Sequence, residues 1–236
     1  MELKLYFRDL AAVFFGAVLS PAILAIMGCV PAFRRADPAL GGRSIIELYV
    51  PIMLAMAIAM IALSTLPAQI ATYRERGILR RLSTTPVRPR DLLAAQAGVQ
   101  MGVLLLASAG VVLIGWLAFG VGLPRNPIAF LAAYVLGIGA LFGVGLMLAS
   151  ARTAKLAAAL GSAVFFPLMF LAGLWVPREV MPGALRTVSD FSPMGAAVQS
   201  LQDASAGHWP QAMHLAVLAI WTVAAWFGAL RLFRYA

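Results

Sequence analysis

Long apolar runs, separated by short polar or charged segments, make up most of this chain. A helix that crosses about 30 Å of hydrocarbon at 1.5 Å per residue needs about 20 consecutive, mostly apolar residues. Six stretches meet this requirement, at residues 10–30, 46–70, 92–119, 128–150, 156–176 and 211–230. The pattern predicts an all-α integral membrane protein with six transmembrane helices, forming one transmembrane domain over residues 1–236.

Composition agrees with this prediction. The mean hydropathy is +0.92 and only 11% of residues are charged, whereas about a quarter are charged in soluble globular proteins. With Cys29 as the only cysteine, an intramolecular disulfide and a cysteine-based metal cluster are both excluded.

The positions of the basic residues predict the orientation, because Lys and Arg are retained in cytoplasmic loops. Twelve of the 18 basic residues lie before the first span, after the second and fourth spans, and at the C-terminus, while six lie in the alternate segments. Both termini are therefore expected to be cytoplasmic. This asymmetry explains most of the net charge of +9 without nucleic acid as a partner.

The segment between the fifth and sixth spans carries its own helix signals. Ser192 followed by Pro193 is a favourable N-cap and first-turn pair for a helix over residues 194–203, and residues 180–188 form a second short apolar stretch. We expect two short helices in the outer leaflet, with Trp175 and Trp209 at the depth of the headgroups. An ordinary extracellular loop is the alternative.

Several kinds of chemistry are missing from the sequence. Its only lysines, Lys4 and Lys155, are each followed by leucine, so no phosphate-binding loop of the G-x-x-x-x-G-K-[ST] type exists. His208 and His214 do not form a zinc-protease motif, and no G-x-S-x-G elbow occurs. We predict no catalytic residue, no metal site and no cofactor in this chain.

The interiors of the spans hold no Asp, Glu, Lys, Arg or His away from their ends. A buried charge in a membrane is costly and is usually kept for a function, so a proton-coupled carrier or an intramembrane enzyme is disfavoured. Gln96 and Gln100 are the most polar interior pair, and helix-to-helix hydrogen bonding is a better interpretation of them than contact with a substrate.

Small and flexible residues recur at helical spacing in three spans. Gly139 and Gly143 form a small-xxx-small pair, which predicts close helix packing either within the chain or between subunits. Methionines in the second span and phenylalanines in the fifth offer an adaptable apolar surface, although packing in the core or against lipid explains such stripes equally. The candidate substrate path consists of Met56, Met60, Phe165 and Phe166.

The segment after the second span gathers charge in an unusual way. Over residues 73–83, helical spacing places Ile78, Leu79 and Leu82 on one side and arginines over the rest. Glu75 has no basic residue three or four positions away within this helix. The segment is therefore either a basic loop on anionic headgroups or a helix that docks on a cytoplasmic partner.

Two stretches of the sequence resemble a known family. "YRERGILRRLSTTPVRPRDLLAAQ" is similar to the segment after the second span in permease subunits of bacterial ATP-binding-cassette exporters of the second, export-type family, and closest to drug and antibiotic exporters. "FFPLMFLAGLWVPREVMPGALRTVSDFSPMGAAVQSLQDASAG" is similar to that family's region around the fifth span and the outer short helices. The segment before the first span is shorter here than an extended N-terminal interfacial helix requires.

The resemblance implies a permease of the bacterial inner membrane that pairs with a second permease copy or homologue and with a separately encoded ATPase, which binds ATP and Mg. It implies that the ATPase contact includes Glu75, Arg76, Gly77, Leu79, Arg80, Arg81 and Leu82. It also implies an outer gate that contains Pro177, Pro182 and Pro193.

The function expected from these observations is ATP-driven export of an amphipathic substrate, a drug or antibiotic by analogy with the family. Export of a lipid-linked saccharide or lipid by the same family is the alternative. A proton-coupled carrier is the rival from another class, and a membrane scaffold without transport activity is the third possibility.

Overall fold

The computed structural model describes residues 13–75 and 89–234. Over these residues the chain is almost entirely helical, and its strands are the two-residue segments β1 (Ala36–Asp37) and β2 (Arg43–Ser44), which pair antiparallel in a small hairpin. The all-α class is confirmed; the hairpin was not expected. The helices are α3 (Leu19–Gly28), α4 (Ile45–Ala59), α5 (Leu66–Glu75), α7 (Pro89–Leu113), α8 (Pro127–Leu148), α9 (Ala154–Leu171), α10 (Gly183–Phe191), α11 (Pro193–Ala206) and α12 (Ala212–Arg234).

Helices that are long and apolar enough to cross a membrane correspond to the second to sixth predicted spans. The described residues contain five of them: Ile45–Glu75, Ala95–Ala118, Pro127–Leu148, Ala154–Leu171 and Ala212–Leu232. The first predicted span is represented by the shorter helix Phe14–Gly28, and the beginning of its predicted range lies outside the described residues. The count of six spans therefore stays a prediction.

Two span boundaries differ from the prediction. The second span continues as helix to Glu75, past the predicted end at residue 70. The fifth ends at Leu171 instead of residue 176, because Gly173 has a φ of +91°, a left-handed conformation that glycine adopts easily and that ends a helix.

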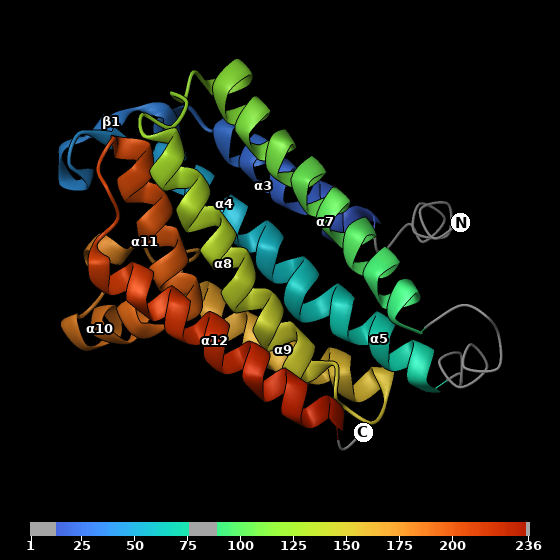
Figure 1. Ribbon diagram of the computed structural model, residues 1–236. Coiled ribbons are helices and arrows are strands. Elements are labelled where there is room, and N and C mark those ends of the chain that lie inside the picture. Colours follow the sequence, from blue (N-terminus) through green and yellow to red (C-terminus); the bar gives the residue numbers. More distant parts are fainter. Residues whose placement is uncertain (1–12, 76–88, 235–236) are drawn as a thin grey trace.

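The bundle has two distinct ends (Figure 1). We call the end that carries Glu75, the start of α7 and the α8–α9 connection the Glu75 end. The opposite end carries β1 and β2, the connection at residues 119–126 and the α11–α12 connection, and we call it the hairpin end. The last described residue lies at the Glu75 end, whereas the first described residues lie beside the middle of α7.

One continuous helix over Ile45–Glu75 passes through the middle of the bundle, and we call it the central helix (Figure 1). Its most apolar stretch is 83% buried, against 22% for the corresponding stretches of Ala154–Leu171 and Ala212–Leu232. It begins at a capping box in which Ser44 Oγ accepts from the Glu47 amide at 3.3 Å and the Glu47 carboxylate accepts from the Ser44 amide at 3.2 Å.

The Gly139–Gly143 pair packs within this chain. Thr222 of α12 lies against Gly139, and Ala225 and Trp226 lie against Gly143 so closely that a Cβ there would approach Ala225 Cβ to 2.8 Å. Trp226 Nε1 also donates to the Gly139 carbonyl at 2.9 Å. Of the two interpretations of this pair, packing within the subunit is the one that the structure shows.

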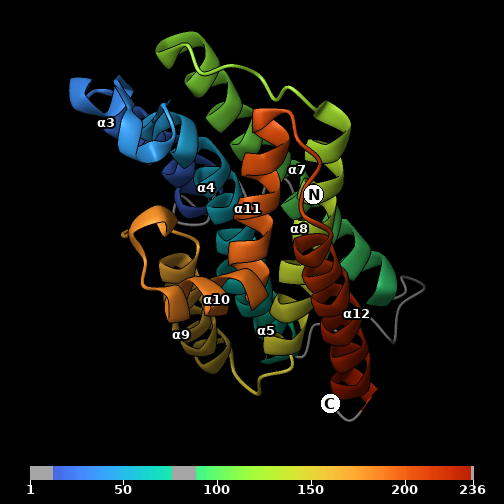
Figure 2. The same cartoon turned by 90° about the vertical axis from the view of Figure 1, so that its left-hand side faces the viewer.

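The short helices α10 and α11 occupy different positions (Figure 2). Helix α10 lies across the bundle, whereas α11 stands along it and packs against α4, α8, α9 and α12. Ser192 Oγ accepts from the Gly195 amide at 2.9 Å and Pro193 occupies the first turn, as the sequence predicts. Because α11 is buried over most of its length, it is part of the core.

The central helix contains a π-helical turn at Met60–Thr65, directly before Pro67. Pro67 has no N–H, so it cannot donate to the carbonyl of Leu63 at the α-helical spacing or to that of Ala62 at the π-helical spacing. Gly145 of α8 lies against the Ala62 carbonyl oxygen and Gly161 of α9 lies against the Leu63 carbonyl oxygen. The π turn is thus held between two glycines. Their Cα–H groups face the Ala62 and Leu63 carbonyls, to which Pro67 cannot donate a hydrogen bond.

We predict that Gly145→Ala and Gly161→Ala each destabilise the protein by about 2 kcal/mol or more, because the added methyl group overlaps a carbonyl oxygen that cannot move aside easily. Gly98→Ala is the matched control, since a Cβ at this helical position meets nothing within 4 Å and alanine favours the helix by up to about 1 kcal/mol. The measurement is the free energy of unfolding in mixed detergent micelles. Equal stability of the Gly145 and Gly98 variants would contradict the packing described here.

Candidate functional site

Glu75 is the last residue of α5 and its side chain is exposed at the end of the central helix. Arg76, Gly77, Leu79, Arg80, Arg81 and Leu82 lie outside the described residues. The structure therefore places one of the seven residues predicted to contact the ATPase, and the docking role of the set stays a prediction. The described residues on either side show how the segment is anchored.

Arg74 ties the end of the central helix to the connection between α8 and α9. Its guanidinium donates to the carbonyl of Ser150 at 3.1 Å and to that of Ala151 at 3.4 Å. These carbonyls lie just after the C-terminus of α8, where backbone acceptors lack intrahelical donors and a cation is favourable. The sequence does not single out Arg74 from the other basic residues of the predicted cytoplasmic segments, because no local pattern reveals an acceptor 76 residues away.

A glutamine cluster ties the central helix to α7. Gln69 Oε1 accepts from Gln100 Nε2 at 2.7 Å and also from Gln96 Nε2, and Tyr73 Oη donates to Gln96 Oε1 at 3.4 Å. Gln96 and Gln100 are both buried. The prediction that they bond helix to helix is confirmed; the sequence did not single out Gln69 as their common acceptor.

The segment at residues 76–88 thus connects two helix ends whose positions are fixed by buried polar contacts. Helix α5 is bound to α7 through Gln69 and to the α8–α9 connection through Arg74. A force applied at Glu75 acts on a helix that continues without a break to Ile45 at the hairpin end. This arrangement is suited to transmitting movement along the bundle rather than to catalysis.

At the hairpin end the central helix is bound to the segment between α9 and α12. Tyr49 Oη donates to the Leu174 carbonyl at 2.8 Å, and Gln202 Nε2 of α11 donates to the Leu48 carbonyl at 3.2 Å. Ser189 Oγ of α10 donates to the Leu171 carbonyl at 2.6 Å. The first turn of the central helix, α10 and α11 are therefore linked through backbone carbonyls.

The three prolines predicted at a gate lie at the starts of three helical elements. Pro177 precedes the 3₁₀ turn Arg178–Val180, Pro182 precedes α10, and Pro193 begins α11. Pro193 is buried and Pro182 is exposed, so the structure does not bring the three together at one surface. Their role as a gate stays a prediction.

The residues of the predicted substrate path also separate. Met56, Met60 and Phe165 are buried in the core, whereas Phe166 is exposed and stacks on Trp175 with ring centroids 6.5 Å apart. Two cavities of about 430 and 420 Å³ in the described part of the chain are lined by other residues. The role of these four residues in transport stays a prediction.

An ion cluster joins α10 to its neighbours. The Asp190 carboxylate accepts from the Arg178 guanidinium and lies 3.3 Å from His214 Nε2 of α12. All three side chains are less than a quarter exposed, and His214 is 3% exposed. The sequence did not reveal this cluster, because its members come from three separate elements.

Loss of the Asp190 carboxylate should leave the Arg178 guanidinium largely buried and without its counter-charge. We predict that Asp190→Ala lowers the free energy of unfolding by about 2–3 kcal/mol, since breaking a buried ion pair costs more than the intact pair contributes. The measurement is unfolding in mixed micelles.

Asp203→Ala on α11 is the control, because within the described residues the Asp203 carboxylate makes no ion pair, and its loss should cost less than about 0.5 kcal/mol. If the two variants are equally stable, Asp190 does not hold α10 in place.

Comparison with known proteins identifies the family. The family model of the ABC-2 type transporter matches residues 1–204, a range that includes Glu75, the following basic segment and α10. No curated protein matches the sequence. The match covers most of the chain, and the described helices have the length and apolar character of a multi-pass membrane domain. The protein therefore belongs to the ABC-2 type transporter family, whose permeases associate with an ABC ATP-binding subunit, and it is a multi-pass permease subunit of the bacterial inner membrane that is not itself the ATPase.

Proposed function

We propose that this permease exports an amphipathic substrate, such as a drug or antibiotic, powered by a separately encoded ATPase that docks on Glu75 and the six motif residues that follow it. ATP and Mg would bind in that ATPase, and a second permease copy or homologue would complete the transporter. The continuous helix from Ile45 to Glu75 is the observation that carries this proposal. It joins the docking segment directly to the opposite end of the bundle.

The proposed orientation places the Glu75 end in the cytoplasm and the hairpin end outside. The excess of basic residues in the segments assigned to the cytoplasm supports this orientation. The last described residue lies at the Glu75 end, which fits a cytoplasmic C-terminus (Figure 1). On this view α10 and α11 belong to the outer leaflet.

Movement along the central helix is the proposed mechanism. Approach of the two ATPase subunits pushes on the docking segment, and α5 moves together with the α8–α9 connection to which Arg74 binds. At the π turn, the close contacts of Gly145 and Gly161 hold α8 and α9 against the central helix, so these two helices move together with it. Tyr49 and Gln202 carry the shift to the Leu174 segment and α11, as a rigid-body transition between two states.

The absence of charged side chains from the interiors of the spans supports the proposed class of substrate. Because the interiors of the predicted spans hold no Asp, Glu, Lys, Arg or His away from their ends, they offer apolar contact instead of charge recognition, which favours a largely apolar substrate over a hydrophilic ion.

The orientation can be tested by cysteine labelling in intact cells. In a Cys29→Ser background, we predict that Arg35→Cys in the hairpin reacts with a membrane-impermeant maleimide while Lys155→Cys reacts only after permeabilisation, because both positions are exposed at opposite ends of the bundle. The reverse labelling pattern would invert the proposed topology.

Docking of the ATPase can be tested at Glu75. We predict that Glu75→Ala lowers efflux of a fluorescent amphipathic dye at least about tenfold in cells with the partner ATPase, because a charged contact in a docking interface is worth about 1.5–3 kcal/mol. The variant should still insert into the membrane and should retain less ATPase on co-purification.

Lys155→Ala, which removes another exposed charge at the same end of the bundle, is the matched control and should keep wild-type efflux. Wild-type efflux by the Glu75 variant would show that this residue does not couple the two subunits.

A further inference from the structure

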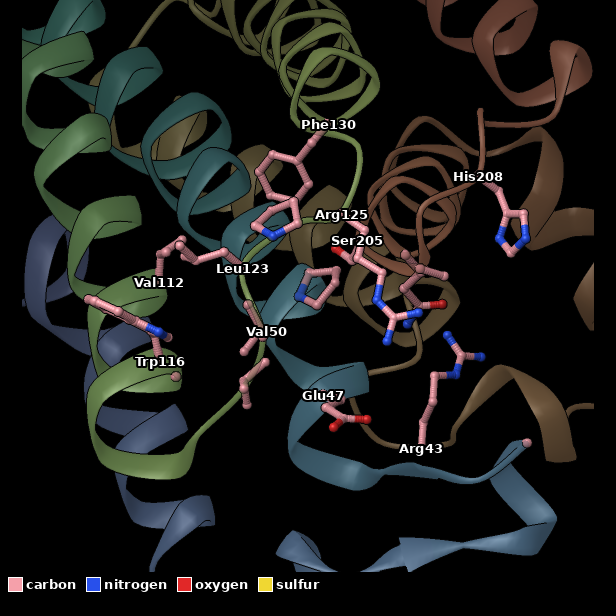
Figure 3. A pocket seen from close by; sticks show the side chains of 18 residues that line it. Arg43, Glu47, Val50, Val112, Trp116, Leu123, Arg125, Phe130, Ser205 and His208 are labelled. Atoms are coloured by element: carbon pink, nitrogen blue, oxygen red, sulfur yellow. The ribbon is translucent and has the colours of Figure 1, made fainter.

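The cavity of about 430 Å³ at the hairpin end lies among elements that are distant in the sequence (Figure 3). Its walls come from the start of the central helix, the end of the third span with the connection that follows, the start of α8 and the end of α11. We call it the Arg125 pocket. The proposed transport mechanism does not use it.

The Arg125 pocket has one apolar side. Val112, Trp116, Leu123 and Phe130 gather on this side in Figure 3, with Val50 of the central helix behind them. The Trp116 side chain is 48% exposed. Since tryptophan in membrane proteins is enriched where hydrocarbon meets headgroups, this side is placed to contact the upper part of an acyl chain.

The other side of the pocket is basic. Arg43 and Arg125 point toward one another in Figure 3, and His208 lies beyond them. Glu47 also lines the pocket, and its carboxylate accepts from the Ser44 amide at 3.2 Å. With two guanidinium groups and one carboxylate, the lining carries one net positive charge when His208 is neutral.

The local structure holds Arg125 in position. Its amide donates to the Ser205 carbonyl at 3.4 Å, and the next amide, of Asn126, donates to Ala204 at 3.2 Å. The stem of Arg125 lies beside Gly207, which ends α11 with a φ of +98°. Within the described part of the chain the Arg125 guanidinium makes no ion pair or side-chain hydrogen bond, so its donors are available to a ligand.

From this arrangement we propose that the Arg125 pocket binds an anionic phospholipid of the surrounding membrane, with the phosphate on Arg125, which Arg43 faces, and the start of an acyl chain against Trp116 and Phe130. Arginine binds phosphate oxygens through paired N–H donors. The single net positive charge complements a monoanionic headgroup such as phosphatidylglycerol. The cavity volume fits a headgroup and the upper part of one chain, while the rest of the lipid lies in the bilayer.

The test is native mass spectrometry of the full chain purified in detergent and incubated with phosphatidylglycerol, phosphatidylcholine or glycerol phosphate. We expect phosphatidylglycerol to be retained most, phosphatidylcholine less, and glycerol phosphate not at all, because the pocket recognises charge and chain together. Arg125→Gln should reduce retention of phosphatidylglycerol about tenfold, the effect of losing a charge-assisted hydrogen bond. Arg35→Gln removes an exposed arginine of the same end that does not line the pocket, and should change retention less than about twofold.

A second variant separates binding from folding. A side chain at Gly122, which lines the pocket, would meet nothing within 4 Å of its Cβ, so Gly122→Leu should reduce the free volume while both arginines remain. It should lower retention of phosphatidylglycerol and keep the thermal unfolding midpoint of the wild type.

Three results would overturn the proposal. Wild-type retention by Arg125→Gln would mean that Arg125 only stabilises the C-terminus of α11. Equal retention of the two phospholipids would exclude recognition of charge, and retention of glycerol phosphate would identify a site for free anions instead of lipid. None of these measurements requires the partner ATPase, so they stand apart from the test of transport.

Discussion

Inside a membrane bundle, every backbone carbonyl must find a donor within the protein, and this constraint decides how the central helix is built. The π turn before Pro67 leaves carbonyl groups without an intrahelical donor in the most deeply buried of the described spans, where the hydrocarbon offers no water to replace it. Helices α8 and α9 contact these carbonyls through Gly145 and Gly161, because only a residue without a side chain lets another backbone come close enough. The irregular turn and the two glycines are therefore one structural unit, although they lie on three helices.

The same constraint explains why the ends of the central helix are bound as they are. Arg74 donates to carbonyls beyond the end of α8, Tyr49 donates to the Leu174 carbonyl, and Gln202 of α11 donates to the Leu48 carbonyl. Between these ends the helix is apolar and tightly enclosed. A rigid element attached at both ends is what a permease needs if energy is delivered on one side of the membrane and the substrate is released on the other.

Much of the fold could be predicted because apolar run length is a strong signal in a membrane protein. The spans and the N-cap of α11 follow from short stretches of sequence, and so does the pairing tendency of Gln96 and Gln100. The partners of these residues could not be predicted. Gln69, the Ser150 carbonyl and the Asp190 cluster meet their counterparts only through tertiary packing, and one helical turn earlier or later in a span would have given other neighbours.

The ends of the second and fifth spans differ from the prediction, and each difference has a local cause. Hydropathy alone does not register that Gly173 adopts a left-handed conformation, so the fifth helix stops earlier than its apolar run. The polar residues at the end of the second span do not stop its helix, because Tyr73 and Arg74 find acceptors on other elements.

The contacts at the two ends of the central helix differ in how strongly they constrain the sequence of the donor and of the acceptor. In the contacts of Arg74, Tyr49 and Gln202 a specific side chain is the donor and a main-chain carbonyl, which every amino acid provides, is the acceptor, whereas Gln69 accepts through its own side chain. The contacts with carbonyls therefore require the side chains of Arg74, Tyr49 and Gln202, but they do not require a particular residue type at Ser150, Ala151 or Leu174, whereas Leu48 is also constrained by its burial in the core. The sequence at the acceptor positions can therefore diverge while the contacts that hold the two ends of the central helix are kept.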